Sequence, residues 1–430
     1  MLKKIKNIIS KTDRFLFEKF GSEKNIKSLE NLKEAKIIFS HLNDIDKKDI
    51  VRFVGGCIRK AYFNENIDDI DLATILKPEE VKEKLKKDNI KVFDTGIDHG
   101  TVTAILNNIK FEITTLREDI LTDGRHADVQ FTTNWEKDAL RRDFTINAIY
   151  ADLDGQIFDP VNGASDLERG EVKFIGSPKE RIKEDYLRIL RYFRFFTQYS
   201  KFDYEEHTIQ CIKQNINGLN QIANERIFDE VKKILSLRKI YNLFDNVHSR
   251  EIILNIFPQF KNWKRLSKIK SLDEELLEEL DPILILGLLI IDQSNNHEYF
   301  CFKYKTSNLI KDRLKILFNN YSNLASQNFF SNNNIKKSLY FNDKQKTKNL
   351  LFFSFFINEK INNLDLKNAI DYLNKCKKPK FPLSGDFLKL RGYESGKKIG
   401  IILNKLEEKW ILNNFELSKE EIEKILKKNG

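Results

Sequence analysis

Glycine is distributed very unevenly along this chain of 430 residues. Nine of its 17 glycines lie between residues 55 and 176, whereas the next 200 residues contain only Gly218 and Gly287. Glycine is typical of the turns between short strands and is disfavoured inside helices. The distribution therefore predicts a strand-containing N-terminal part followed by a long helical part.

The spacing of apolar residues agrees with this division. Strand-like runs occupy residues 51–54, 69–75, 102–106, 111–116 and 147–151. Later segments repeat apolar residues every three or four positions, as one face of a helix does; they are 181–199, 225–237 and 277–291. We therefore predict a mixed α+β protein, in which an α/β head is followed by an all-α C-terminal region.

The predicted head covers residues 1–165. We divide the helical part into a neck over 166–240, a body over 241–360 and a tail over 361–430. A polar loop is expected at 331–334, between two helices of the body.

Composition and charge set limits on the class of protein. Hydrophobic residues make up 41% of the chain and charged residues 32%, which is typical of a folded globular protein. The net charge of +10 suits a polyanionic partner, but the Lys-, Asn- and Ile-rich composition of an AT-rich genome explains it equally well. The four cysteines, Cys57, Cys211, Cys301 and Cys376, are scattered and are expected to be reduced thiols. The longest apolar run, 282–291, is about half of a membrane span and predicts a core helix.

Two acidic residues two positions apart, Asp69 and Asp71, lie inside a strand-like run. Side chains at i and i+2 of a strand share a face, so the two carboxylates lie side by side. Close carboxylates repel each other, and divalent cations relieve that repulsion. Such a pair can hold two metal ions that clamp the attacking and leaving oxygens of a phosphoryl transfer. Taken alone, the pattern is more often a polar strand edge.

Two further runs favour the metal interpretation. Residues 53–56 form an apolar run that ends in Gly55-Gly56, a turn whose amides could approach a triphosphate, and Arg59 follows it. The run 110–114 places Glu112 on one strand face. Taken singly, these runs are a strand–turn–helix junction and a solvated carboxylate.

Together the segments resemble the polymerase-β nucleotidyltransferase superfamily, specifically the class II tRNA CCA-adding enzymes and their bacterial poly(A) polymerase relatives. Seven strings occur in the family's order: VGGCIR (54–59), DIDLAT (69–74), FEITTLR (111–117), DGRHADVQFT (123–132), RRDFTINA (141–148), IFDPVNGASDL (157–167) and RIKEDYLRILRYFRF (181–195). A further string at 385–400 resembles the family's tail, which grips the tRNA elbow.

The resemblance implies roles for the acidic and glycine-rich strings. It implies that Asp69 and Asp71 bind two Mg²⁺ ions, that Glu112 is the third catalytic carboxylate, and that Gly56 and Arg59 contact the triphosphate. The string at 123–132, with Arg125, resembles the flexible loop that reshapes the site between CTP and ATP. Arg142 resembles a nucleotide-binding arginine, although an ordinary Arg–Asp surface pair is the alternative.

One departure and one base-reading element complete the resemblance. The family usually has aspartate at position 60, where this chain has Lys60, which questions any role that needs a carboxylate there. Asp185 and Arg188 are expected to be neighbours on one helical face and to read the amino-bearing edges of cytosine and adenine. Arg191 and Arg194 continue that spacing and are implied to serve the nucleotide or primer site.

The implied activity is template-independent addition of C, C and A to tRNA from CTP and ATP, with contacts to the acceptor stem and elbow. The alternatives are a poly(A) polymerase, a partial A-adding enzyme, or a non-catalytic RNA-binding protein on the same fold. None of the six histidines is followed by aspartate, so no metal phosphohydrolase domain is expected. We expect no membrane association, no obligate protein partner and a cytoplasmic location, while an organellar origin stays open.

Overall fold

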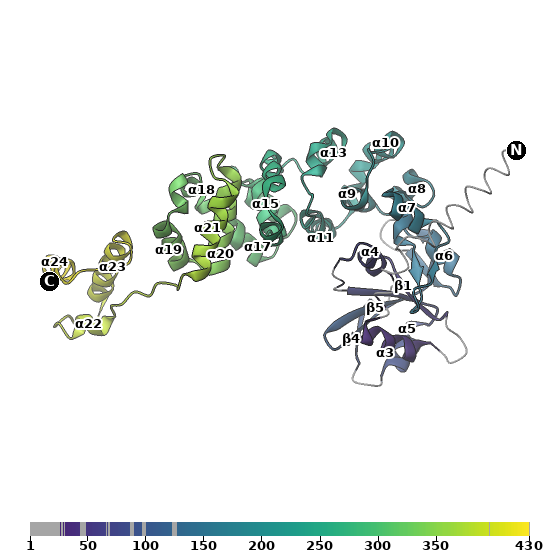
Figure 1. The fold of residues 1–430 in the computed structure, drawn as a ribbon, viewed down its shortest axis with the longest axis horizontal. Coiled ribbons are helices and arrows are strands. Elements are labelled where there is room, and N and C mark those ends of the chain that lie inside the picture. The colour runs from purple at the N-terminus through teal and green to yellow at the C-terminus, as the bar shows by residue number, and fades with distance from the viewer. Residues whose placement is uncertain are drawn as a thin grey trace. The chain divides into compact units, whose positions relative to one another are not determined.

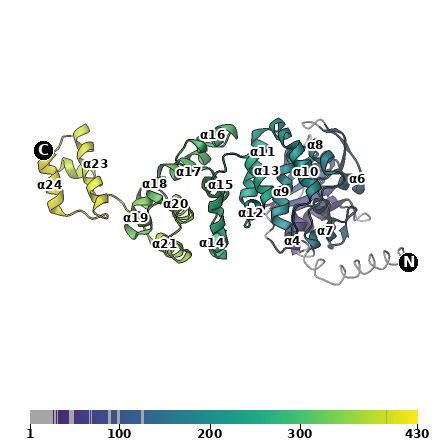
Figure 2. The same ribbon diagram turned by 90° about the horizontal axis from the view of Figure 1, so that it is seen from above.

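The computed structural model describes residues 26, 29, 31–43, 49–65, 67, 69–86, 90–96, 100–122, 127–394 and 396–429. The chain forms two compact units, Met1–Ala223 and Asn224–Gly430 (Figures 1 and 2). Their boundary falls inside the predicted neck, 166–240. The finer division into neck, body and tail stays a prediction.

A seven-stranded sheet forms the centre of the first unit, in the order β3-β4-β5-β2-β1-β8-β9. Its strands are β1 (Val51–Val54), β2 (Asp69–Thr74), β3 (Lys91–Gly96), β4 (Thr101–Leu106), β5 (Ile109–Thr115), β8 (Tyr150–Ala151) and β9 (Ile157–Phe158). β2 and β5 pair in parallel, and the other neighbouring strands of this sheet pair antiparallel. A separate two-stranded sheet joins β6 (Arg117–Thr122) to β7 (Ala127–Phe131).

Helices pack beside these strands in the first unit. They are α3 (Lys33–Leu42), α4 (Gly56–Tyr62), α5 (Pro78–Leu85), α6 (Trp135–Leu140), α7 (Gly163–Arg169), α8 (Pro178–Glu184), α9 (Arg188–Tyr199) and α10 (Glu206–Asn215), with 3-10 helices η3 (Thr145–Asn147) and η4 (Ile216–Gln221). The strand predicted at 147–151 is confirmed only for Tyr150–Ala151. Residues before it form η3, whose buried polar side chains bond other parts of the chain: Thr145 bonds Asp166, and Asn147 bonds Arg59 and Asp143.

The prediction of a single helix over 181–199 is wrong, because the helix is interrupted between α8 and α9. Asp185 has extended backbone angles, φ −153° and ψ 106°. Its carboxylate accepts a hydrogen bond from the Leu187 amide at 3.1 Å, and its carbonyl accepts one from the Arg188 amide at 3.0 Å. A short acidic side chain that bonds nearby amides competes with helix continuation. Asp185 therefore ends one helix and begins the next.

The second unit is helical throughout its described length. Its elements are α11 (Asn224–Leu235), α12 (Asn242–Asp245), α13 (Val247–Ile256), η5 (Trp263–Ser271), α14 (Glu274–Glu278), α15 (Pro282–Ile290), α16 (Asn296–Lys303), α17 (Asn308–Asn319), α18 (Tyr321–Leu324), η6 (Gln327–Phe330), α19 (Asn332–Phe341), α20 (Lys344–Ile357), α21 (Asn363–Lys375), α22 (Gly385–Lys389), α23 (Lys397–Leu412) and α24 (Lys419–Asn429). The prediction of a mixed α+β fold with an all-α C-terminal region is confirmed.

Capping residues explain where two predictions for this unit were wrong. The helix predicted over 277–291 is divided into α14 and α15, because Asp281 accepts hydrogen bonds from the Ile283 and Leu284 amides ahead of Pro282. The predicted polar loop at 331–334 is mostly the first turn of α19, capped by Ser331. Residues of α15 from Ile283 onward are buried, so the predicted core helix is confirmed.

The four cysteines are free thiols, as predicted. Among the described residues, no helix is long and apolar enough to cross a membrane.

Candidate active site

The parallel pairing of β2 and β5 brings the predicted acidic residues together. Asp71 lies directly opposite Glu112, and Asp69 lies opposite Lys110. Neighbours in register share a face, as do positions i and i+2 of one strand. Asp69, Asp71, Lys110 and Glu112 therefore lie on one face of the sheet. The predicted alignment of the two aspartates on a strand is confirmed.

Asp71 packs against the start of α4, at the glycine turn. A Cβ atom at Gly56 would lie only 2.9 Å from Asp71 Oδ2, so a side chain at residue 56 would displace that carboxylate. The preceding Gly55 has φ +66°, which a residue with a side chain rarely adopts. Gly55 therefore allows the turn between strand and helix, and Gly56 leaves space for the Asp71 carboxylate in its observed position.

Burial raises the pKa of Asp71 above its ordinary value, and the negative charge of Glu112 raises it further. Arg59 and Arg142 act in the opposite direction, and the net pKa shift is upward. Among the described residues, no basic side chain forms a hydrogen bond or ion pair with Asp71. The site therefore contains negative charge that a divalent cation would neutralise.

Glu112 is engaged with a lysine of its own strand. Lys110 Nζ lies 2.5 Å from Glu112 Oε1, and both side chains are 41% exposed. Across the part of the chain that the structure describes, no three His, Cys, Asp or Glu side chains are arranged to hold a metal ion. Asp69 and Asp71 are therefore the acidic pair on this face, and Glu112 is paired with Lys110.

Arg59, predicted to contact the triphosphate, is buried on α4. Its Nη1 donates hydrogen bonds to Asn147 Oδ1 and, at 3.2 Å, to the Ile146 carbonyl. Its guanidinium carbon lies 4.8 Å from the centre of the Phe195 ring. Within the described residues its Nε is buried and has no hydrogen-bond partner.

Arg142 is held by Asp138, four residues earlier. Its Nε and Nη2 lie 3.1 and 3.0 Å from Asp138 Oδ2, and the neighbouring Arg141 binds Oδ1. Burial opposes ionisation of Asp138, but the charges of both arginines and a bond from Tyr150 hold its pKa well below the usual range. The partner of Arg142 is therefore a buried residue, not the adjacent Asp143 of a surface pair.

Asp143 binds an arginine from a different element. Arg191 Nε on α9 donates to Asp143 Oδ2 at 2.6 Å, and Asn147 Nδ2 donates to Oδ1 at 2.6 Å. Burial opposes ionisation of Asp143 as well, but Arg191 and Asn147 lower its pKa below the ordinary value. The ion pair between Asp143 and Arg191 thus joins the predicted head to α9.

The predicted pairing of Asp185 and Arg188 on one helical face is wrong, because Asp185 precedes α9 and has extended backbone. Arg188 Nη1 instead donates to the Arg181 carbonyl at 2.9 Å and to Glu184. Arg194 lies over the Phe195 ring, 4.0 Å from its centre. Arg125 lies outside the described residues.

Comparison with known proteins decides the family. Residues 51–173 match the family model described as the poly A polymerase head domain, and residues 201–264 match the probable RNA and SrmB-binding site of polymerase A. The chain is 32% identical to the mitochondrial CCA tRNA nucleotidyltransferase 1 of Mus musculus, over 96% of this chain and 94% of that protein. It is also 32% identical to the CCA-adding enzyme of Lactobacillus helveticus, over 87% and 92%. The chain belongs to the CCA tRNA nucleotidyltransferase family.

Solved structures agree with this CCA tRNA nucleotidyltransferase assignment at the level of the fold. The Bacillus stearothermophilus CCA-adding enzyme in complex with CTP aligns with a TM-score of 0.68 at 22% identity, covering 92% of this chain and 97% of its own. The Thermotoga maritima CCA-adding enzyme complexed with tRNA aligns with a TM-score of 0.62 at 19% identity, covering 94% and 98%.

Sequence reasoning missed two buried residues of this nucleotidyltransferase head, Asp138 and Asn147. Asp138 had a usable signal, because it lies three and four positions before Arg141 and Arg142, where helical side chains meet. Asn147 had none, because its bond from Arg59 spans 88 positions and its bond to Asp143, four positions away, is made in a 3-10 turn where the sequence predicted a strand.

Proposed function

We propose that this chain adds C, C and A to the 3′ end of tRNA without a template, using CTP and ATP and releasing pyrophosphate. The observation that carries the proposal is the aspartate pair on β2, in a chain whose CCA-adding relatives align over nearly its whole length. The tRNA 3′-hydroxyl would attack the α-phosphorus in line, so no protein nucleophile is needed.

Asp69 and Asp71 are the residues that we propose to hold two Mg²⁺ ions, with Glu112 as the third carboxylate. When bound, these ions would lower the pKa of the attacking hydroxyl and neutralise charge on the triphosphate. The chain itself supplies two adjacent carboxylates on a rigid strand, with Gly56 leaving space beside Asp71.

Arginines supply the charge that the triphosphate needs. We propose that Arg59 and Arg142 bind phosphate oxygens, since guanidinium groups form charge-assisted hydrogen bonds with them. The positive charges of both arginines lower the pKa of Asp71, which supports a role beside the aspartate pair. Arg191 and Arg194, on α9, are proposed to serve the nucleotide or the primer.

Base choice is proposed to depend on Asp185 and Arg188 at the junction of α8 and α9. A carboxylate accepts from the exocyclic amine of cytosine or adenine, and a guanidinium donates to a ring acceptor. Uracil and guanine present a carbonyl where the amine would be. The Leu187 amide fixes the Asp185 carboxylate at 3.1 Å, so it is held even without a continuous helix.

The proposed partners are the tRNA acceptor stem and elbow, and the tail of the chain is proposed to contact the elbow. In this tail, α22, α23 and α24 pack around their own apolar cluster, which includes Ile402 and Leu406. A cytoplasmic location is proposed as well. The vertebrate relatives are named as mitochondrial proteins.

Single-nucleotide incorporation tests the proposed activity against its rivals. Transcripts of tRNA ending at the discriminator base, at C or at CC would be incubated with CTP, ATP, UTP or GTP separately. We expect two C additions to the first transcript and one A addition to the last. Unlimited A addition to unrelated RNA would assign the chain to poly(A) polymerases, and A addition to the CC transcript alone would make it an A-adding enzyme.

Replacing Asp185 tests the base-reading proposal. The variant Asp185→Ala should reduce the preference for C and A over U and G by about ten- to 100-fold, since a good base-edge contact gives ~1–3 kcal/mol of discrimination. The ratio of kcat/KM values for the four nucleotides measures this preference. Asp203→Ala, on the loop after α9, serves as the control. Unchanged discrimination in the Asp185 variant would contradict the assignment.

A further inference from the structure

Asn147, the last residue of η3, connects α4, the segment between α6 and η3 and, through Asp143, α9. Its amide oxygen accepts a hydrogen bond from Arg59 Nη1, and its backbone oxygen accepts one from Arg142 Nη1 at 3.3 Å. Its amide nitrogen donates to Asp143 Oδ1 at 2.6 Å, and Asp143 in turn accepts from Arg191 Nε at 2.6 Å. Three of the proposed nucleotide-binding arginines are therefore linked through this one residue.

The chemistry of the position suits an amide closely. Asn147 is 6% exposed, so its side chain must satisfy its neighbours without water. Arg59 requires an acceptor and Asp143 requires a donor, and an amide offers both on one short side chain. A carboxylate at residue 147 would repel Asp143, and an apolar side chain would leave two charged groups without this partner.

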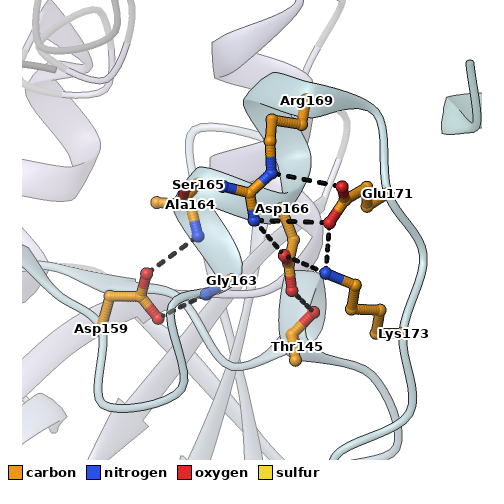
Figure 3. Close-up of polar contacts among 9 residues, drawn as sticks. All are labelled: Thr145, Asp159, Gly163, Ala164, Ser165, Asp166, Arg169, Glu171 and Lys173. Carbon is orange, nitrogen blue, oxygen red and sulfur yellow. Dashed lines mark hydrogen bonds and ion pairs between the residues drawn. The ribbon is translucent and has the colours of Figure 1, made fainter. Parts of the chain in front are cut away.

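The turn that carries Asn147 packs against α7 (Figure 3). A Cβ atom at Gly163 would lie 2.0 Å from the Thr145 carbonyl oxygen, so helix and turn touch through a glycine. Thr145 Oγ1 donates to Asp166 Oδ2 at 2.8 Å, and Asp166 is 4% exposed. Asp159 fixes the start of α7 by accepting from the Gly163 and Ala164 amides at 2.9 and 2.8 Å. Together these contacts hold η3, and with it Asn147, in one place.

We propose that Asn147 is a positioning residue that orients Arg59, Arg142 and Arg191 toward the bound nucleotide. The inference rests on the proposed function, because it assumes that these arginines bind CTP and ATP. The proposal also explains why Lys60 is compatible with the site, although a lysine side chain cannot accept a hydrogen bond from Arg59 as an aspartate would. In this chain the acceptors come from η3 instead, as Asn147 Oδ1 and the Ile146 carbonyl.

The test compares Asn147→Ala with a matched variant, Asn296→Ala. Asn296 is also a buried asparagine, and its amide donates to the Gln259 and Ile290 carbonyls in the other unit. Both variants should lower the thermal stability. Only Asn147→Ala should raise KM about ten-fold for CTP and for ATP alike, with a smaller change in kcat, because hydrogen bonds to charged groups are lost. The dissociation constants for tRNA and for Mn²⁺ should not change.

A double-mutant cycle with Arg59→Lys separates positioning from general damage. If Asn147 acts through Arg59, its replacement should have a much smaller effect on KM in the Arg59→Lys background. Additive effects, or equal KM changes in Asn147→Ala and Asn296→Ala, would overturn the proposal. Calorimetric titration of CTP into wild type and Asn147→Ala gives the same comparison if no nucleotide is incorporated into tRNA. In that case the proposed function fails, and the titration still decides the role of Asn147.

Discussion

Two groups of acidic residues in the first unit have opposite electrostatic environments. Asp69 and Asp71 lie on β2, and the pKa of Asp71 is raised by burial and by Glu112. Asp138 lies on α6 and Asp143 just before η3, and arginines hold their pKa values below the ordinary range despite stronger burial. The two groups are in the same unit and consist of the same residue type.

The difference indicates what each group does. Asp138 binds Arg141 and Arg142 directly, and Asp143 binds Arg191, so their negative charges are balanced by the chain itself. Among the described residues, Asp71 has no such bonded partner. An acid whose charge the protein leaves unbalanced is suited to an exchangeable cation, whereas a balanced acid orients its arginines. Five experiments test this contrast, beginning with the largest expected effect.

Removing a carboxylate of the first group should abolish the chemistry. In Asp71→Ala, nucleotide incorporation into tRNA should fall by about 10⁴-fold or more, since metal charge stabilisation is worth several kcal/mol of the barrier. Single-turnover incorporation of labelled CTP and ATP measures the loss. Binding of tRNA, followed by filter retention, should stay close to that of wild type. Incorporation within ten-fold of wild type would contradict the metal role of Asp71.

Removing the charge of an acid in the second group should instead destabilise the unit. Asp138 is 1% exposed, and Asp138→Asn would leave two arginines without their carboxylate. Breaking such a buried pair costs about 3–5 kcal/mol, which urea denaturation would detect. The control is Asp49→Asn, whose partner Arg52 lies 2.9 Å away but whose side chain is 76% exposed; its cost should be below ~1 kcal/mol.

The pH dependence gives a second check on Asp138. Its pKa is lower in the folded than in the unfolded chain, so its stabilisation is present above the ordinary aspartate value of 3.8. The stabilisation is lost as the pH falls through the lowered value. The stability difference between wild type and Asp138→Asn should therefore shrink in acid. A difference that stayed constant from pH 7 to pH 3 would contradict the ion-pair explanation.

The sequence was sufficient where local patterns decide structure. β1 was predicted with its observed ends, and the two aspartates of β2 lie on a shared face because strand periodicity fixes side-chain direction. The all-α region was recognisable from its apolar spacing and its scarcity of glycine. Gly56 was singled out from its motif, and its contact with Asp71 gives a physical reason for it.

Sequence reasoning failed where a side chain chooses between local and distant partners. Periodicity suggested one helix through Asp185, but its carboxylate and carbonyl accept from the Leu187 and Arg188 amides, and α8 ends there. The pairing of Arg191 with Asp143 spans 48 positions and follows no local rule. Likewise, Lys110 lies beside Asp69 only through the parallel register of β2 and β5, which no local pattern predicts.

Lys110 offers a smaller test of the unbalanced group. Its ammonium lies 2.5 Å from Glu112, beside the proposed metal ions. Glu112, Asp69 and Asp71 all raise its pKa. Lys110→Met should bind Mn²⁺ about ten-fold more tightly, the order expected for removing one nearby positive charge. Electron paramagnetic resonance of free Mn²⁺ measures the affinity. Lys110→Arg keeps the charge and should match wild type; equal affinity in all three proteins would remove Lys110 from the site.

The smallest expected effect is on the stability difference between Asp71→Asn and wild type, which should change sign when Mg²⁺ replaces a chelator. Its pKa is higher in the folded than in the unfolded chain, so the folded state binds more protons between pH 3.8 and that raised value. Stability should therefore fall as the pH rises through this window. At neutral pH with a chelator present, Asp71→Asn should be more stable than wild type by about 0.5 kcal/mol, at the lower end for single stabilising changes. Saturating Mg²⁺ should reverse the order, because it stabilises only a chain that binds it. An Asp71→Asn variant less stable than wild type in chelator would place Asp71 with the balanced acids, alongside Asp138.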